Sequence, residues 1–192
     1  MIAGLLLAAG GATRFGSQKL IAPFNGTPLV RQAADALARA TDAVIVVVGN
    51  DATAVRDALR DSQARFVENS DWATGLASSL RCGVAALGPE VEAVVVALGD
   101  QPGIDSAVIR EVVEIWRKAQ SPIVATRYAG VRGHPVLFDR AVFGELAGLT
   151  GDVGAKPILD RSLDRVAYLD LAVAVPRDVD TRRDLDVLNS GA

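Results

Sequence analysis

The feature that most constrains the fold of this chain is a regular alternation of short apolar runs with helix-like stretches. Apolar runs of strand length occupy residues 2–8, 43–48, 91–98 and 123–126. Between them, apolar residues recur at spacings of three and four, which is typical of one face of a helix. Strands that alternate with helices pair in parallel through right-handed crossovers, so the pattern predicts a buried parallel sheet.

Residues of cap and turn type mark where the expected helices begin. Thr27 lies before a proline at the first helical position, and Asp51 precedes a short stretch with helical spacing. Gly75 precedes a stretch in which apolar residues form one stripe. Asp105 or Ser106 is expected to cap a longer helix.

In the last third of the chain the alternation changes. We expect strands at residues 134–138 and 165–170, and short helices at 140–147 and 184–188. The expected fold class is therefore α/β and Rossmann-like, with a mostly parallel central sheet, an antiparallel edge and helices on both faces. Because no linker, repeat or low-complexity tract divides the chain, residues 1–192 are expected to form a single domain.

Composition and charge exclude several classes of function. Hydrophobic residues make up 50% of the chain and the net charge is −3, so no overall basic field could hold a nucleic-acid backbone. No apolar run approaches the roughly 18 residues that span a membrane. Residues 1–9 lack a basic leader, which favours a strand over a signal peptide. The single cysteine, Cys82, cannot form an intrachain disulfide, and this fits a cytoplasmic location.

The loop after the first strand carries small residues and two cations. It begins with Ala9, Gly10 and Gly11 and continues to Arg14 and Lys19. Small residues allow backbone N–H groups to approach a ligand, and arginine and lysine suit phosphate oxygens. The spacing differs from the dinucleotide-binding and P-loop glycine motifs. A phosphate-binding loop and a plain glycine turn with two solvated cations are both compatible with this segment.

Two acidic segments are candidates for a metal site. Asp100 directly follows the third apolar run, at the strand end where open α/β sheets bind ligands, and its carboxylate suits Mg²⁺. Asp178 and Asp180 alternate along an extended segment, so both carboxylates are expected on one side. The structural alternatives are that Asp100 turns the chain before Pro102, and that Asp180 or Thr181 caps the last helix.

Three further segments are weaker candidates. At Gly75 a helix begins whose N–H groups could read a base, with the hydroxyl of Ser79 beside them. His134 is the only histidine, and Lys156 lies in a second glycine-flexed loop, so either could meet an acceptor. A plain helix entry, a structural histidine and a solvated lysine are also compatible with these segments. Cys82 is interpreted as small core filling.

Short strings along the chain form an ordered set. They are Leu-Ala-Ala-Gly-Gly-Ala-Thr-Arg-Phe-Gly at 7–16 with Lys19, Pro-Phe-Asn-Gly-Thr-Pro-Leu at 23–29, Gly-Leu-Ala-Ser-Ser-Leu at 75–80, Leu-Gly-Asp-Gln-Pro at 98–102, Gly-His-Pro-Val-Leu-Phe at 133–138, Gly-Asp-Val-Gly-Ala-Lys at 151–156 and Asp-Val-Asp-Thr at 178–181. In this order they resemble the molybdenum-cofactor nucleotidyltransferases, and more closely the molybdopterin cytidylyltransferase branch. Each string is weak alone, but the set spans almost the whole chain.

The resemblance implies a nucleotidyltransferase fold and a set of site residues. The nucleotide would be bound by small loop residues and a helix start, namely Ala8, Ala9, Gly10, Gly11, Gly75 and Ser79. Arg14 and Lys19 would hold the triphosphate, and with Asp100 they form the expected catalytic set. Asp100 and Asp180 would bind Mg²⁺.

The resemblance also implies substrates and partners. CTP would be the donor and molybdopterin the acceptor, with His134 and Lys156 facing the pterin phosphate. The product would pass to a molybdoenzyme or its maturation chaperone. The opening Ala8-Ala9-Gly10 is similar to members that use CTP, whereas members that use GTP tend to read Leu-Ala-Gly-Gly. Arg182 departs from the family, which often has proline there.

The expected reaction transfers CMP from CTP to molybdopterin and releases pyrophosphate. The acceptor phosphate is ionised near neutral pH, so its attack needs no general base. The alternatives within the same class are guanylyl transfer and transfer to another small phosphorylated acceptor. The alternatives of other classes are a molybdenum-cofactor carrier or chaperone without turnover, and an NADPH-dependent reductase on the same fold.

Overall fold

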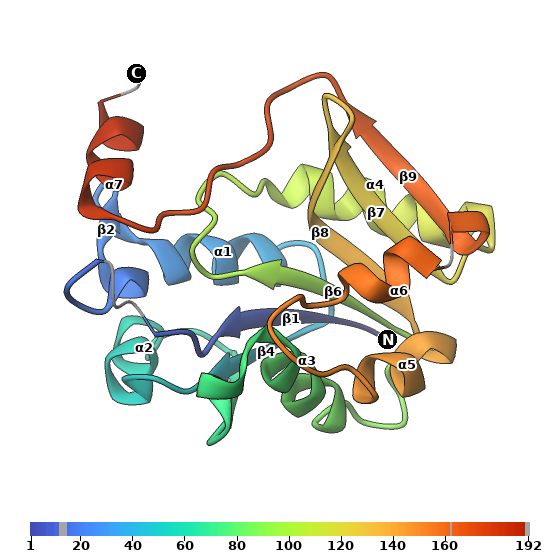
Figure 1. Cartoon of the computed structure of the whole chain (residues 1–192), viewed down its shortest axis with the longest axis horizontal. Coiled ribbons are helices and arrows are strands. Elements are labelled where there is room, and N and C mark those ends of the chain that lie inside the picture. The colour runs from blue at the N-terminus through green and yellow to red at the C-terminus, as the bar shows by residue number, and fades with distance from the viewer. Residues whose placement is uncertain (12–14, 162, 191–192) are drawn as a thin grey trace.

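The computed structural model describes residues 1–11, 15–161 and 163–190. Its centre is a seven-stranded sheet in the order β5-β4-β1-β6-β8-β7-β9 (Figure 1). In chain order the strands of this sheet are β1 Ile2–Ala8, β4 Ala43–Val48, β5 Arg65–Glu68, β6 Ala93–Leu98, β7 Ile123–Tyr128, β8 Val131–Asp139 and β9 Val166–Leu171. A small separate hairpin joins β2 Pro23–Phe24 to β3 Thr27–Pro28.

Strand direction confirms the predicted fold class. β1 pairs in parallel with both β4 and β6, and β5 and β9 also join the sheet in parallel. The antiparallel pairings lie toward one edge, where β8 runs between β6 and β7 against the direction of both. The parallel strands β1 and β6 therefore end side by side, which places the loops after Ala8 and Leu98 next to each other.

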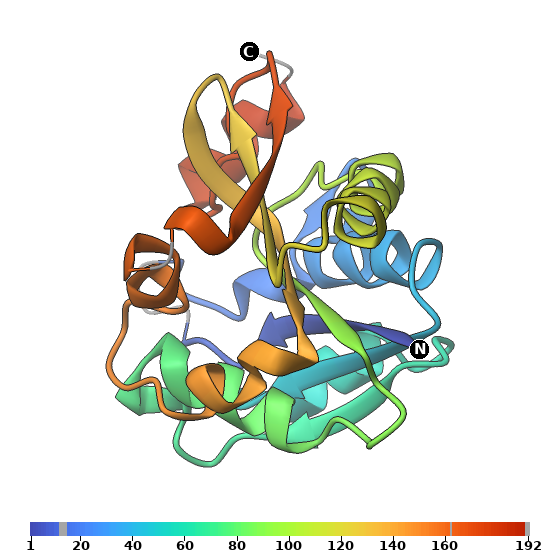
Figure 2. The same ribbon diagram turned by 90° about the vertical axis from the view of Figure 1, so that its right-hand side faces the viewer.

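Helices cover both faces of the sheet, as predicted, and α4 and α6 lie on opposite sides of it in Figure 2. Leu6 and Ala8 point toward the face that holds α1 Leu29–Ala38, α2 Ala52–Ala58 and α4 Ser106–Ala119. Leu5 and Leu7 point toward the face that holds α3 Leu76–Ala85, α5 Phe143–Ala147 and α6 Lys156–Arg161. Because side chains alternate along a strand, one apolar run supplies both cores.

A third small cluster attaches the C-terminal segment to the first loop. Phe15, Leu29, Val179 and Leu185 are buried together, and they bring α7 Arg182–Asn189 against the start of α1. The segment before α7 thereby returns to the C-terminal edge of β6, although it is the last part of the chain. Short 3₁₀ turns complete the structure: η1 Lys19–Ile21, η2 Trp72–Thr74, η3 Arg140–Val142 and η4 Leu163–Arg165.

Several local expectations were wrong or incomplete. Thr27 does not cap α1, because it forms β3 with its proline and the helix begins at Leu29 without a side-chain cap. Asp105, not Ser106, caps α4, since its carboxylate accepts a hydrogen bond from the Ala107 N–H at 2.9 Å. β5 and α6 were not predicted. β5 is short and only half-buried, so its apolar signal is weak.

No helix among the described residues is long and apolar enough to cross a membrane.

Candidate functional site

Two adjoining cavities open beyond the C-terminal ends of β1 and β6. One has a volume of about 590 Å³ and is walled by the loop after β1 and the start of α3; we call it the nucleotide cavity. The other has a volume of about 680 Å³ and lies between β8, α6 and the segment before α7; we call it the acceptor cavity. Leu7, Leu76, Leu98 and Asp178 line both. This is where open α/β sheets bind ligands.

An ion triad lies at this junction. The Nζ atom of Lys19 is 2.6 Å from Oδ2 of Asp100 and 3.3 Å from Oδ1 of Asp180. The Lys19 side chain is only 12% exposed, so its charge is largely removed from water. Burial acts to lower the pKa of Lys19, but the charges and hydrogen bonds of Asp100 and Asp180 raise it above its ordinary value. The sequence-predicted Lys19, Asp100 and Asp180 are therefore brought together.

Backbone pairing holds the C-terminal segment against the loop after β6. The N–H of Val179 donates to the carbonyl of Asp100 at 3.0 Å, and the Val179 side chain is fully buried. Asp178 and Asp180 flank this buried residue, and both line the acceptor cavity, in agreement with the expected alternation. Nε2 of Gln101 donates to Oδ1 of Asp178 at 2.6 Å. Burial, with the nearby negative charges of Asp100 and Asp180, raises the pKa of Asp178.

The capping alternative for this segment is also confirmed, with Thr181 and not Asp180 as the capping residue. Thr181 is the N-cap of α7, and its hydroxyl accepts a hydrogen bond from the Asp184 N–H at 3.2 Å. The Asp184 carboxylate accepts in turn from the Thr181 N–H at 2.7 Å, which completes a capping box. The cap fixes the segment, while the carboxylate of Asp180 points to Lys19.

The pair of carboxylates fits a divalent cation. Asp100 and Asp180 reach one ammonium, so their oxygens lie close enough to share a cation, and carboxylate oxygens are the ligands that hard divalent ions prefer. Within the part of the chain that the structure describes, no group of three or more His, Cys, Asp or Glu side chains has metal-binding geometry. Phosphate oxygens and water would therefore complete the coordination shell.

The glycine loop forms the floor of the nucleotide cavity. Ala8, Ala9, Gly10 and Gly11 all line it. A Cβ atom added at Gly10 would meet nothing within 4 Å, so the backbone there is open to a ligand. A Cβ at Gly11 would lie 3.0 Å from the ring of Trp72. The loop therefore leaves its backbone accessible at Gly10, while at Gly11 the ring of Trp72, which also lines this cavity, packs closely against it.

Two site features stand apart from the sequence predictions. Trp72 lines the nucleotide cavity but was not predicted, because a lone tryptophan in a turn carries no recognisable pattern. Arg14, expected to bind the triphosphate, lies outside the described residues. Its role remains a prediction.

The start of α3 does not present the N–H groups expected to read a base. The Leu76 N–H donates to Oδ1 of Asp152 at 3.0 Å, and the Ala77 N–H donates to the carbonyl of Gly151 at 3.2 Å. Gly75 has φ of 112°, and a Cβ there would lie 2.7 Å from the Gly151 carbonyl oxygen, so glycine is required for this approach. The helix start is occupied by the loop at 151–152, which the sequence did not indicate.

Gly75 and Ser79 themselves do line the nucleotide cavity. The Ser79 side chain is 5% exposed, and its hydroxyl accepts a hydrogen bond from Nδ2 of Asn69 at 3.1 Å. Asn69 is also buried and bonds Ser78 at 2.8 Å. The hydroxyl of Ser79 is thus oriented by a buried amide, and it donates to no other group within the part of the chain that the structure describes.

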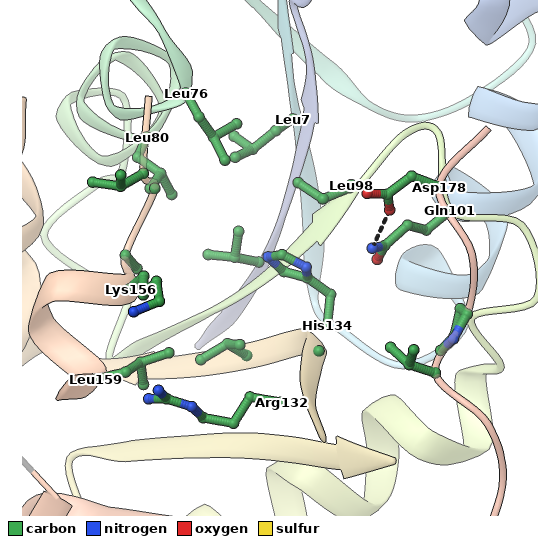
Figure 3. A pocket seen from close by; sticks show the side chains of 18 of the residues that line it. Leu7, Leu76, Leu80, Leu98, Gln101, Arg132, His134, Lys156, Leu159 and Asp178 are labelled. Atoms are coloured by element: carbon green, nitrogen blue, oxygen red, sulfur yellow. Dashed lines mark hydrogen bonds between the residues drawn. The ribbon is translucent and has the colours of Figure 1, made fainter. Parts of the chain in front are cut away.

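The acceptor cavity is mostly apolar, with polar groups at its two sides. Figure 3 shows Gln101 and Asp178 on one side and Arg132 and Lys156 on the other, with the His134 ring between them. Burial lowers the pKa of His134 to about 4, against the opposing effect of the Asp100 charge. The imidazole is therefore neutral at pH 7. The predicted residues His134 and Lys156 do line one cavity, as expected for acceptor contacts.

Arg132 is a cavity residue that the sequence interpretation missed. Its Nη2 donates to Oδ1 of Asp160, and Nζ of Lys156 donates to Oδ2 of the same carboxylate at 2.5 Å. These two cations lower the pKa of Asp160. The available signal was spacing, because Arg132 lies two residues before His134 and residues two apart on a strand share a face.

Comparisons with known proteins agree with this geometry. Residues 4–166 match the family model of the MobA-like NTP transferase domain. The nicotine blue oxidoreductase of Paenarthrobacter nicotinovorans is 31% identical, over 94% of this chain and 92% of that protein. The 8-amino-3,8-dideoxy-manno-octulosonate cytidylyltransferase of Shewanella amazonensis is 25% identical, over 91% of this chain and 67% of that protein.

A solved structure of a similar protein has the same arrangement of elements. The crystal structure of Rv0371c from Mycobacterium tuberculosis H37Rv has a TM-score of 0.89 and 35% identity, over 98% of this chain and 97% of that chain. A second structure of Rv0371c is a complex with manganese, with a TM-score of 0.86, 33% identity and coverage of 100% and 99%. The family match, the sequence identity and the shared fold together place this chain in the same superfamily as these proteins.

Proposed function

This chain belongs to the MobA-like NTP transferase domain family, and from that premise we propose that it is a cytidylyltransferase that transfers CMP from CTP to molybdopterin. The observation that carries the proposal is the junction of two cavities at Lys19, Asp100 and Asp180. A nucleotide in one cavity and an acceptor in the other would place the reacting phosphorus atom beside this triad. In-line transfer requires the attacking oxygen and the leaving pyrophosphate oxygen to lie on opposite sides of the α-phosphorus, and two adjoining cavities would allow this arrangement.

Donor binding is assigned to the nucleotide cavity. Gly10 leaves its backbone open, and Lys19 supplies a fixed positive charge for the β- and γ-phosphates, which Arg14 would share. Lys19 now bonds two carboxylates, so its ammonium would exchange one of them for phosphate oxygens when the nucleotide binds. The leaving pyrophosphate then carries its charge next to Lys19, which stabilises the transition state.

The metal assignment rests on the fit of Asp100 and Asp180 to a divalent cation. A bound Mg²⁺ ion would offset charge on the α-phosphate and orient it. The manganese complex of the similar Rv0371c structure supports a divalent site in this fold without selecting between Mg²⁺ and Mn²⁺. In this chain the role of Asp100 and Asp180 is to hold that cation at the junction of the cavities.

The acceptor side supports attack without a general base. The oxygen of an acceptor phosphate forms the new bond to the α-phosphorus of CTP while the bond to the β-phosphate oxygen breaks. Because His134 is neutral at pH 7 and its pKa is about 4, it is not poised to exchange a proton with that phosphate. Its neutral ring instead contacts and orients the acceptor. The apolar walls of the cavity suit a flat heterocycle such as a pterin.

The choice of CTP rests on the opening Ala8-Ala9-Gly10 and on a relative named as a cytidylyltransferase. Pyrophosphate release should be measured with CTP, GTP and ATP in separate reactions, each with molybdenum-loaded molybdopterin and Mg²⁺ or Mn²⁺. Faster release with CTP supports the proposal. Preference for GTP would keep the mechanism and reverse the choice of base. Nucleotide binding without release in any reaction would favour a carrier or chaperone.

A second candidate function is a reductase on the same fold. One observation favours it, namely the 31% identity with a protein named nicotine blue oxidoreductase over most of both chains. The loop after β1 lacks the glycine spacing of dinucleotide-binding motifs, which argues against it. Loss of NADPH absorbance with quinone-like dye acceptors would test it. Turnover of NADPH together with no pyrophosphate release would replace the transferase proposal.

A further inference from the structure

The far side of the acceptor cavity holds a pair of cations tied to one carboxylate. Arg132 on β8 and Lys156 at the start of α6 both donate to Asp160, one to each carboxylate oxygen. Asp160 lies one helical turn after Lys156, so α6 fixes the carboxylate and the carboxylate in turn fixes both cations. Arg132 and Lys156 are therefore held next to each other by ion pairs with one carboxylate.

Donor groups remain on both cations. Nη1 of Arg132 is buried and has no hydrogen-bond partner within the described part of the chain. The Lys156 side chain is 68% exposed, and an ammonium has three N–H donors, of which Asp160 takes one. A buried guanidinium nitrogen without a hydrogen-bond partner lowers the stability of the fold. A small movement of the side chain would present this nitrogen to a ligand in the cavity.

Neighbouring charges leave an excess of positive charge at this side. Arg127 on β7 is directly opposite Arg132 in the strand register. It is already neutralised, since its Nε and Nη2 donate to both oxygens of Asp170 at 2.7 Å and its guanidinium covers the Tyr168 ring. Asp160 is thus shared by two cations, while Asp170 is committed to another. The group of Arg132, Lys156 and Asp160 therefore carries two positive charges and one negative charge, and both cations line the acceptor cavity.

We propose that Arg132 and Lys156 form an oxyanion subsite that anchors the end of the acceptor opposite to its reacting phosphate, whereas the family resemblance placed Lys156 at that phosphate. The inference rests on the proposed transferase function and narrows its substrate class. The acceptor would carry two anionic groups, one attacking at the Lys19 junction and one held at Arg132. Between them, the apolar side chains of Leu80, Val136 and Leu159 line the space for its body. His134, between the two sides, contacts that body (Figure 3).

The subsite can be tested without nucleotide by adding simple oxyanions to the whole, ¹⁵N-labelled protein. Inorganic phosphate, molybdate and acetate are titrated separately, and amide shifts at residues 132–134 and 153–160 are followed. We expect saturable shifts there. The anion that binds most tightly identifies the second anionic group of the acceptor as a phosphate, an oxo-metal group or a carboxylate. Anion binding at Lys19 shifts a different set of amides, so the two locations are resolved.

The variants are R132Q on β8 and a control, R161Q, which removes an arginine of α6, the helix that carries Lys156 and Asp160, at a position outside the cavity wall. R132Q should weaken the local binding about tenfold or more, because a charged hydrogen-bond donor is lost, and R161Q should leave it unchanged. K156Q, at an exposed position, should weaken it as well and serves if R132Q does not fold. Unchanged binding in a folded R132Q, equal loss in R161Q, or no saturable shift with any anion would overturn the subsite.

These outcomes separate this inference from the proposed function. If anions bind saturably and R132Q loses this binding, but CTP gives no pyrophosphate release, then the oxyanion subsite is supported and the transferase proposal is rejected. Pyrophosphate release with no local anion binding does the reverse. A further readout is the split of kinetic constants, because a residue that anchors the far end of the acceptor should raise the KM for the acceptor in R132Q and leave the KM for CTP unchanged.

Discussion

The nucleotide cavity and the acceptor cavity meet at Lys19, but different parts of the fold build them. The nucleotide cavity is made mainly by the loop after β1 and by the segment between β5 and α3, with Asp100 after β6, so most of its residues come in short, contiguous strings. The acceptor cavity draws on β8, on α6 and on the segment before α7, and its cations come from residues 24 positions apart, at Arg132 and Lys156. The comparison teaches that a site at the ends of parallel strands is formed by residues close together in the sequence. A site beside the antiparallel strand is formed by residues far apart in the sequence.

The largest effect is expected at the junction that the two cavities share. Asp100→Asn removes one of the two charges that face the cation, and nucleotidyl transfer should fall by about 10²–10³-fold, as for loss of one transition-state stabiliser. The fold should persist, since the amide is nearly the same shape. Steady-state pyrophosphate release measures the rate. Asp51→Asn is the control: it follows the neighbouring strand β4 at φ of 52°, a conformation that asparagine tolerates. A near-normal rate in Asp100→Asn would exclude Asp100 from the chemistry.

The second prediction separates the two partners of the triad. Lys19→Met removes the buried ammonium, so CTP affinity should fall by about tenfold or more through lost charge-assisted hydrogen bonds. Without nucleotide, Mn²⁺ should bind more tightly than in wild type, because no ammonium competes for Asp100 and Asp180. Calorimetric titration measures both. The exposed Lys118→Met is the control. Weaker Mn²⁺ binding in Lys19→Met would contradict the interpretation that the ammonium occupies the cation position.

The third prediction compares two glycines on the nucleotide side. Gly49→Ala should destabilise the fold by about 1–3 kcal/mol through overpacking, because the new Cβ would lie 2.8 Å from Cβ of Trp72 and 2.9 Å from the Ala9 carbonyl oxygen. Gly10→Ala should change stability by less than about 0.5 kcal/mol but weaken CTP binding, because its Cβ projects only into open space. Urea unfolding and CTP titration test the pair. Equal CTP affinity in wild type and Gly10→Ala would place the nucleotide elsewhere.

The smallest effect is a pH dependence on the acceptor side. The pKa of His134 is about 4 in the folded protein, below its ordinary value of 6.5, so the unfolded chain binds more protons between these values. Stability is therefore lost as pH falls from about 6.5 toward 4. Since part of the ring faces the cavity, we expect this group to change the free energy of unfolding by about 1–2 kcal/mol across that pH range. Urea unfolding of wild type and His134→Asn across this range should show a shallower slope in the variant. Parallel slopes would mean that His134 is solvated.

Much of this fold follows from the sequence. Strands β1, β4 and β6 were predicted because their apolar runs are long and buried on both faces, and the parallel order follows from their alternation with helices. β5 and α6 were not predictable in the same way. β5 is a half-buried edge strand, and α6 is only six residues long and follows a loop with no cap signal. The formation of such short strands and helices depends on tertiary contacts more than on their own sequence pattern.

For the site, the sequence by itself determined which groups stand at the ends of buried strands: the glycine loop with Lys19, and Asp100. Their positions are local consequences of where a strand ends. Only the tertiary structure decided that Asp180 meets Lys19, through the buried Val179, and that Arg132 and Lys156 share Asp160. It also decided that the first N–H groups of α3 are already bonded to the loop at 151–152. Such contacts join residues far apart in the chain, and their pairing depends on packing that no local pattern records.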